Sequence, residues 1–183
     1  MSQHIAFLFP GQGSQSVGML AELAKSHAIV RQTFDEASQA LDVDLRALVN
    51  DGPLEELNQT YNTQPAMLAA GVAVWRVWQE SQGKQPQVMA GHSLGEYTAL
   101  VCAEAIAFGD AVALVAERGR LMQEAVPPGE GAMAAVLGLD DEQVRALCAE
   151  ASEGCLLYTS PSPRDHLSYL VCRLLLEKKW GGG

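Results

Sequence analysis

The sequence has little positive charge, no long apolar run and no cysteine motif, and each absence excludes a class of protein. Its 183 residues include 12 Lys and Arg against 22 Asp and Glu, a net charge of −10. That balance disfavours nucleic acid or an anionic membrane as a partner. No stretch approaches the roughly 18 apolar residues of a membrane-spanning helix. The first residues do not combine a basic segment with an apolar one, so no secretory signal is predicted.

The four cysteines show neither C-x-x-C spacing nor histidines at metal-ligand distances; they are Cys102, Cys148, Cys155 and Cys172. We therefore expect reduced thiols, no metal site and a cytoplasmic location. The length suits one domain, or one domain with a small appendage.

What the sequence does contain is a sharp turn, Gly91-His92-Ser93-Leu94-Gly95, between a predicted strand (87–90) and a predicted helix (94–105). G-x-S-x-G between strand and helix is typical of a nucleophile elbow, where the serine is held in a strained conformation and only glycine fits two residues away on either side. The positive end of the helix dipole would then stabilise an oxyanion. The alternative is a glycine-rich turn whose serine only caps the helix.

A second glycine-rich loop, Pro10-Gly11-Gln12-Gly13, follows the apolar strand predicted for residues 4–9. It is not a dinucleotide-binding fingerprint, because Ser16 stands where the third glycine is required. In a nucleophile elbow, one oxyanion-hole amide belongs to the residue after the serine, here Leu94, and the second to a neighbouring strand-end loop. We predict Gln12 for the second amide, although an ordinary turn is the alternative.

The base that a serine nucleophile needs is not found among the histidines. His92 adjoins Ser93 and should point away from its hydroxyl, and the other three are His4, His27 and His166. Arg118 is a candidate for gripping a carboxylate with two hydrogen bonds, and the adjoining Gly119 allows close approach. A solvated or ion-paired arginine is the ordinary alternative.

Alternating strands and helices predict an α/β fold with a mostly parallel sheet. Residues 1–126 would form an α/β core, and Pro127-Pro128-Gly129 would open a smaller subdomain over 127–154.

At residue 155 the charge changes sign: residues 1–154 carry 8 basic and 20 acidic residues, whereas 155–183 carry 4 and 2. The same stretch contains a Ser-Pro-Ser-Pro segment that has neither helix nor strand period. The two observations together predict that residues 155–183 are a non-native or disordered tail, of the kind that read-through into vector or adapter DNA would produce. An authentic flexible extension is the alternative.

Four motifs resemble, in order and spacing, the malonyl-CoA:acyl carrier protein transacylases of type II fatty acid synthesis. They are Phe9-Pro10-Gly11-Gln12-Gly13-Ser14-Gln15, Gln64-Pro65-Ala66, Gly91-His92-Ser93-Leu94-Gly95-Glu96-Tyr97 and Arg118-Gly119. The likeness covers residues 3–154. It implies an α/β-hydrolase-like parallel sheet with a nucleophile elbow, and the start of an inserted ferredoxin-like α+β subdomain.

The resemblance also implies the reaction of an [acyl-carrier-protein] S-malonyltransferase. Ser93 would attack the thioester of malonyl-CoA, and the phosphopantetheine thiol of acyl carrier protein would then accept the malonyl group. Arg118 would pair with the malonyl carboxylate, the amides of Gln12 and Leu94 would hold the oxyanion, and Gln12 and His92 would contact substrate. No bound cofactor is expected. Family members are longer and carry their catalytic histidine later, so we expect an amino-terminal fragment that lacks a general base and is inactive alone.

Three other functions remain open. One is an acyltransferase domain from a polyketide or type I fatty acid synthase, although a start at Met1 directly before the first strand favours a discrete enzyme. An α/β-hydrolase esterase would not need Arg118. The third is a non-catalytic fragment that binds carrier protein, which the acidic composition disfavours because these carrier proteins are themselves acidic.

Overall fold

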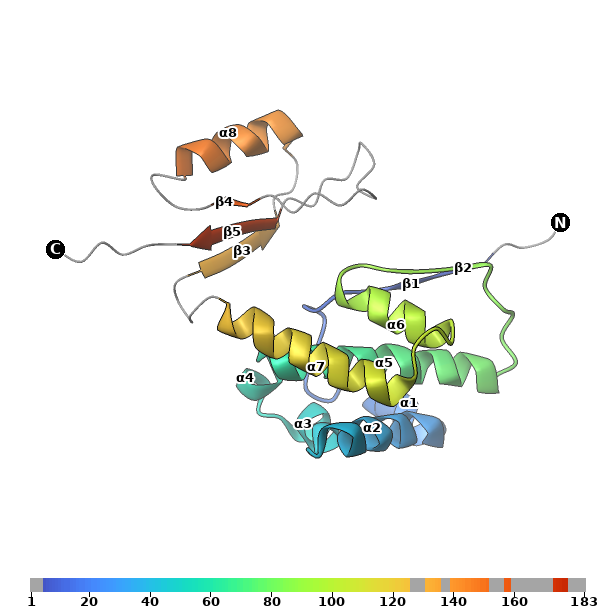
Figure 1. Cartoon of the computed structure of the whole chain (residues 1–183). Coiled ribbons are helices and arrows are strands. Elements are labelled where there is room, and N and C mark those ends of the chain that lie inside the picture. Colours follow the sequence, from blue (N-terminus) through green and yellow to red (C-terminus); the bar gives the residue numbers. More distant parts are fainter. Residues whose placement is uncertain (1–4, 126–130, 136–138, 152–156, 159–172, 178–183) are drawn as a thin grey trace. The chain divides into compact units, whose positions relative to one another are not determined.

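The computed structural model describes residues 5–125, 131–135, 139–151, 157–158 and 173–177 (Figure 1). The chain forms two compact units, Met1–Gln123 and Glu124–Gly183. All the site residues predicted from the sequence lie in the first unit.

Strands β1 (Ala6–Phe9) and β2 (Val88–Gly91) form a parallel pair, with Ala6 beside Val88 and Phe9 beside Gly91. Their side chains alternate between two faces. On one face the ring of Phe7 packs edge-on against Trp75 and Trp78, at centroid distances of 5.3 and 5.4 Å. On the other face Leu8 and Val88 are 77% and 57% exposed. One face of the sheet therefore packs against helices, and the other is apolar and exposed.

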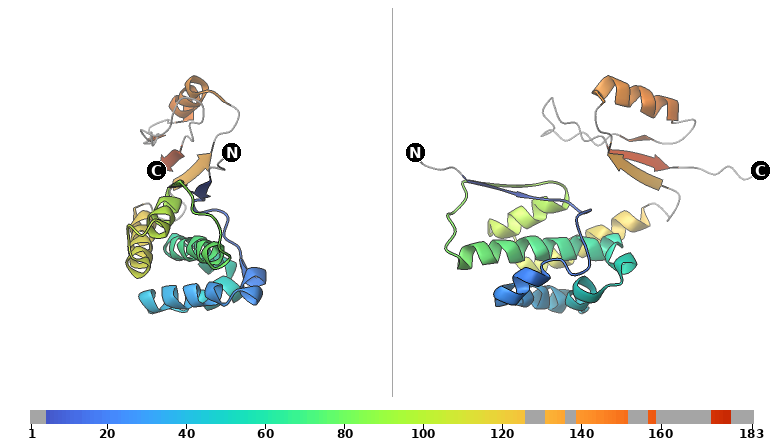
Figure 2. Two further views of the ribbon diagram at one scale, coloured as in Figure 1. Left: turned by 90° about the vertical axis from the view of Figure 1, so that its right-hand side faces the viewer. Right: turned by 180° about the vertical axis from the view of Figure 1, so that it is seen from behind.

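Seven helices complete the first unit: α1 (Ala21–Ser26), α2 (Ala28–Leu41), α3 (Leu45–Asp51), α4 (Leu54–Leu57), α5 (Thr60–Glu80), α6 (Leu94–Cys102) and α7 (Phe108–Glu124). They form two layers beneath the strands: the nearer layer is α5, α6 and α7, of which α6 contacts both strands, and α1, α2 and α3 lie beyond α5 (Figures 1 and 2). Helix α5 is buried on most sides, as its lack of a narrow apolar stripe predicts. Parallel strands flanked by helices confirm the α/β class.

Helix α5 begins at Thr60, earlier than the cap that the sequence predicts at Thr63, and Pro65 lies inside it. The extra turn is held by one contact distant in sequence and by two local ones. The backbone N–H of Thr60 donates to Oε1 of Gln123 at 2.9 Å, and the Gln59 carbonyl accepts from the amides of Asn62 and Thr63. A helix start supported from α7 leaves no local signal.

The second unit contains α8 (Asp141–Ala151) and an antiparallel sheet of order β3-β5-β4, formed by Gly131–Ala135, Arg173–Glu177 and Leu157–Tyr158. Asp140 caps α8 through two reciprocal hydrogen bonds with Gln143. The backbone amide of Gln143 donates to Oδ1 of Asp140 at 2.9 Å, and the backbone amide of Asp140 donates to Oε1 of Gln143 at 3.1 Å. Strands β4 and β5 fall within 155–183, where the sequence predicts a tail, and β5 pairs with β3 along its whole length. The non-native origin of this segment, the ferredoxin-like character and the boundaries after 126 and 154 stay predictions.

Candidate functional site

Ser93 occupies a strained backbone conformation between β2 and α6. Its φ and ψ are 54° and −109°, outside the regions that L-residues favour. A Cβ on Gly95 would lie 2.1 Å from the carbonyl oxygen of Phe9, and one on Gly91 would lie 1.9 Å from the carbonyl oxygen of Gly95. Only glycine fits at either position, which is the steric reason for the G-x-S-x-G spacing.

Hydrogen bonds tie this turn to the end of β1. The His92 amide donates to the Phe9 carbonyl at 3.1 Å, and the Gly95 amide donates to the His92 carbonyl at 2.9 Å. Gly11 lies alongside, because a Cβ there would be 3.1 Å from the His92 carbonyl oxygen and 3.9 Å from Cβ of Ser93. The loop that contains Gln12 therefore runs beside the serine, where a second oxyanion-hole amide is required.

Arg118, on α7, reaches the serine from the helical side. Its Nη2 donates to Oγ of Ser93 at 3.2 Å, and its Nη1 donates to Oε1 of Gln64 at 2.8 Å. The guanidinium carbon lies 5.6 Å from the centroid of the Tyr97 ring, a cation–π distance. Gln64 is fully buried, and its Nε2 donates to the sulfur of Met122 at 3.3 Å. Side chains from α5, α6 and the elbow thus fix one guanidinium beside one hydroxyl.

Gly119 permits this arrangement by letting α7 approach the start of α5. A Cβ there would lie 2.6 Å from the carbonyl oxygen of Thr60 and 2.7 Å from Cα of Tyr61. Gln123 reinforces the contact through its hydrogen bonds to Thr60 and to the Gln59 side chain. The sequence predicts a close approach at Gly119, and in the structure the group that approaches is the start of α5.

The sequence did not predict that Gln64, Tyr97 and Met122 contribute to this site. The first two lie within the motifs that carry the family resemblance, but no role was predicted for their side chains. A usable signal exists for Gln64, a large polar residue directly before a helix segment that is apolar and buried from Pro65 to Ala70. Such a side chain requires a buried partner. No comparable signal marks Tyr97 or Met122, since both residue types also occur as ordinary packing.

Within the part of the chain that the structure describes, no histidine hydrogen-bonds to Ser93. His92 is exposed, and its ring lies against Gly11, with Nδ1 3.2 Å from where a Cβ of that glycine would be. His27 precedes α2 in the far helical layer, and His4 and His166 fall outside the described residues. Arg118 cannot replace a base because a guanidinium stays protonated. The described site thus places a strained serine beside a cation and contains no base.

Within the described segments, no three His, Cys, Asp or Glu side chains are grouped to hold a metal ion. No helix there is both long enough and apolar enough to cross a bilayer.

A model of the family "Acyl transferase domain" matches residues 6–162. The chain belongs to the acyl transferase domain family. Among curated relatives, the malonyl CoA-acyl carrier protein transacylase of Escherichia coli strain K12 is 64% identical over 149 residues, which are 81% of this chain and 48% of that protein. The chain spans about half the length of the curated relatives it matches. The resemblance predicted from the four motifs is confirmed.

Solved structures agree with this family assignment. The malonyl CoA-acyl carrier protein transacylase of Coxiella burnetii has 50% sequence identity and a TM-score of 0.84, covering 95% of this chain and 53% of its own. A malonyl-transacylase solved in complex with a type II PKS acyl-carrier protein has 52% identity and a TM-score of 0.82, covering 95% and 54%. Both support the α/β acyltransferase fold around the elbow.

Proposed function

We propose that this chain carries the nucleophile and substrate-binding half of an acyltransferase that moves a malonyl group from malonyl-CoA to the phosphopantetheine thiol of acyl carrier protein. The observation that carries the proposal is the 3.2 Å hydrogen bond from Arg118 to Oγ of Ser93. In a malonyl ester a single CH₂ separates the carboxylate from the reacting carbonyl. A guanidinium one hydrogen bond from the nucleophile is therefore at a suitable distance for that carboxylate.

In the first half-reaction, Oγ of Ser93 bonds to the thioester carbonyl carbon and loses its proton to a base. The carbon–sulfur bond then breaks, and CoA leaves as the thiol. The amides of Leu94 and Gln12 would hold the oxyanion at the positive end of α6. In the second half-reaction, the phosphopantetheine thiol gives its proton to the base and its sulfur bonds to the ester carbonyl carbon. The bond from that carbon to Oγ of Ser93 then breaks, and Oγ takes the proton back from the base.

Arg118 would select the substrate in this scheme. Its contacts with Gln64 and Tyr97 hold the guanidinium in place before a carboxylate arrives, so little side-chain entropy remains to be lost on binding. A substrate without the carboxylate would leave this cation unpaired. His92 and Gln12, beside the elbow, would contact the rest of the acyl group.

The names of the relatives support the choice of partner and substrate. Relatives of 59–64% identity are named malonyl CoA-acyl carrier protein transacylases, and one solved relative is bound to an acyl-carrier protein. The cytoplasmic location and the absence of a bound cofactor remain predictions from the sequence.

A hybrid enzyme tests the proposal. Residues 1–154 of this chain are joined to the remaining half of the Escherichia coli relative, and malonyl transfer to acyl carrier protein is measured. We expect transfer by the hybrid, none by its Ser93→Ala variant, and a drop of about 100-fold in malonyl transfer with Arg118→Ala. Acetyl transfer should not fall in Arg118→Ala.

Arg120→Ala is the matched control, because Arg120 lies two residues further along α7 and pairs with Glu117 at the surface. Full malonyl selectivity in the Arg118→Ala hybrid would contradict the proposed role. Because no base is present in the described site, we expect the 183-residue chain alone to show little or no turnover. Robust transfer by that chain would contradict this second expectation.

A further inference from the structure

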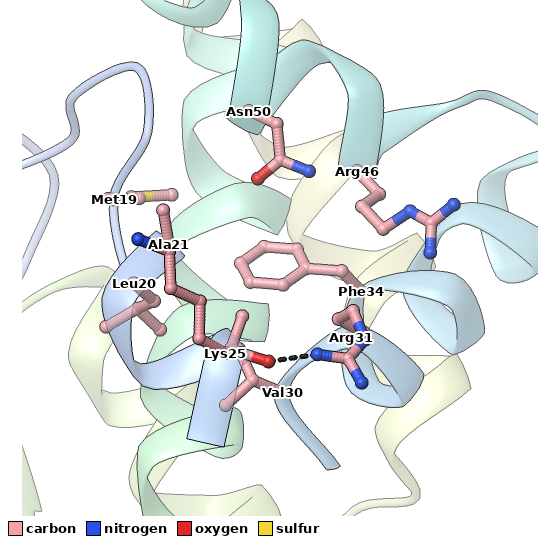
Figure 3. A pocket seen from close by; sticks show the side chains of 10 residues that line it. Met19, Leu20, Ala21, Lys25, Val30, Arg31, Phe34, Arg46 and Asn50 are labelled. Atoms are coloured by element: carbon pink, nitrogen blue, oxygen red, sulfur yellow. Dashed lines mark hydrogen bonds between the residues drawn. The ribbon is translucent and has the colours of Figure 1, made fainter. Parts of the chain in front are cut away.

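A pocket of about 230 Å³ lies among α1, α2 and α3, on the far side of α5 from the strands that lead to Ser93 (Figure 3). Its apolar lining includes Val30 and Phe34, which are 1% and 4% exposed. Figure 3 shows the Phe34 ring among the lining side chains, with the Asn50 amide on one side of it and the guanidinium groups of Arg31 and Arg46 on another. One wall of the pocket is thus apolar and its rim is polar.

The rim is positively charged in a chain that is otherwise acidic. Three of the chain's 12 Lys and Arg residues line the pocket, namely Lys25, Arg31 and Arg46. None of its 22 Asp and Glu residues lines it. A concave surface lined by charges of one sign concentrates ions of the opposite sign. The charge of this pocket therefore favours an anion.

The three cations are not equally neutralised. Lys25 pairs with Glu22 at 2.6 Å, and Arg46 pairs with Asp35 at 3.0 Å. Arg31 instead donates to the carbonyl oxygen of Ala24, and within the described segments no carboxylate pairs with it. This backbone contact holds the guanidinium over the pocket and leaves its charge available to a ligand.

The pocket volume limits the ligand. A water-sized group occupies about 30 Å³, so the pocket has room for about eight non-hydrogen atoms. It is smaller than the roughly 300 Å³ at which pockets for drug-sized molecules begin.

We propose that this pocket binds a small amphiphilic carboxylate of about eight non-hydrogen atoms. Its apolar part would pack on Met19 and Leu20, the partly exposed apolar side chains of the lining, and its carboxylate would bind Arg31. The site uses no residue of the Ser93 centre, so it is separate from the proposed acyl transfer and does not depend on it.

Sodium hexanoate, which has eight non-hydrogen atoms, is the probe. It is titrated into the ¹⁵N-labelled 183-residue chain at constant ionic strength while amide shifts are followed by NMR. We expect saturable shifts at Met19, Phe34 and Asn50, with a dissociation constant on the order of millimolar for so small a ligand. The neutral analogue 1-hexanol should bind about five-fold more weakly.

Arg31→Gln is the decisive variant, because Arg31 is exposed and its loss should leave the fold intact, as circular dichroism can verify. It should weaken hexanoate binding about five-fold and leave 1-hexanol binding unchanged. Arg120→Gln, a surface change outside the pocket, should alter neither. Equal affinity for hexanoate and 1-hexanol, unchanged binding by Arg31→Gln, or the absence of saturable shifts at the pocket would each overturn the proposal.

Discussion

The two ends of helix α6 bear a hydroxyl and a thiol, each near an arginine, and the two side chains differ in burial. Ser93 precedes the helix, is half-buried, and accepts a hydrogen bond from Arg118 at 3.2 Å. Cys102 ends the helix and is 5% exposed. Burial raises the pKa of its thiol from 9.0 to about 12, against the opposing charge of Arg76.

The comparison shows that a nearby arginine does not by itself activate a nucleophile. At the start of α6, the positive end of the helix dipole favours an anion. At its end, the carbonyl groups and the negative end of the dipole disfavour one. Burial at Cys102 outweighs the charge of Arg76. Helix direction and solvent access therefore distinguish the two sites more than residue type does.

The largest effect should come from removing the geometry that exposes Ser93. Gly95→Ala would place a Cβ 2.1 Å from the carbonyl oxygen of Phe9 and 2.7 Å from that of Pro10. Both obstacles are backbone atoms, so the elbow cannot adjust without separating α6 from β1. We expect a loss of more than about 3 kcal/mol in the free energy of unfolding, measured by urea titration with tryptophan fluorescence.

Gly109→Ala is the control for that substitution. A Cβ at Gly109, in the first turn of α7, would meet only Cβ of Ala40 at 4.0 Å. Alanine in a helix is favoured over glycine by about 0.5–1 kcal/mol, so this variant should be as stable as the parent or slightly more so. A similar loss in both variants would show that the elbow is not specially constrained.

The second prediction places the same chemical group at both ends of α6. In Ser93→Cys, the introduced thiol lies at the helix N-terminus beside Arg118, which should lower its pKa below the usual 8.5 or so. At pH 7.5 we expect iodoacetamide to alkylate it at least about 100-fold faster than Cys102 in the same molecule. Peptide mass spectrometry over time measures both rates.

Urea provides the control, since both thiols should react at similar rates in the unfolded chain. Adding Arg118→Ala to Ser93→Cys should slow the introduced thiol several-fold without changing Cys102. Equal rates for the two thiols in the folded protein would remove the contrast between the ends of the helix.

The third prediction concerns the side chain that holds Arg118. Gln64→Leu removes the acceptor of the 2.8 Å hydrogen bond and leaves the guanidinium facing an apolar group. Because Gln64 is fully buried, we expect a loss of about 2 kcal/mol in the free energy of unfolding. Gln79→Leu, at an exposed glutamine of the same helix, should stay within about 0.5 kcal/mol of the parent. A negligible cost for Gln64→Leu would mean that Arg118 is not held through this contact.

The elbow could be predicted from the sequence because its constraint is local. The spacing of Gly91, Ser93 and Gly95 encodes contacts within a five-residue turn, and the structure reproduces the strain at Ser93 and the exclusion of Cβ at both glycines. The parallel pairing of β1 and β2 followed from two short apolar runs that each precede a helix.

The surroundings of Arg118 could not be predicted in the same way. Its partner Gln64 is 54 positions away along the chain, and the contact depends on how α7 crosses α5 at Gly119. The early start of α5 depends on Gln123 from α7. Strand β3 pairs with β5, which lies about 40 residues further along the chain. The segment between them includes Ser-Pro-Ser-Pro, which has no strand period. Only long-range packing determines these features.

The smallest expected effect is the pH dependence that the buried thiol imposes at the end of α6. The pKa of Cys102 is about 12 in the folded chain, against 9.0 for an ordinary thiol. Below about pH 8 the thiol is protonated in both states and contributes no pH dependence. As the pH rises from 8 towards 12 the unfolded chain releases its proton first, so unfolding becomes more favourable. Once the unfolded thiol is ionised, one pH unit in that window corresponds to about 1.4 kcal/mol, and at pH 10 we expect a loss of about 1.4 kcal/mol relative to pH 8.

Other groups titrate over the same range, so the comparison is made with Cys102→Ala. That variant loses the same packing energy at both pH values. Because it has no thiol at this position, its free energy of unfolding should fall less between pH 8 and pH 10. The change in unfolding free energy from pH 8 to pH 10 is measured for each protein, and the two changes are then compared. If the two proteins lose the same stability, Cys102 ionises as easily folded as unfolded. Burial would then not outweigh Arg76, and the contrast with Ser93 would rest on the helix dipole alone.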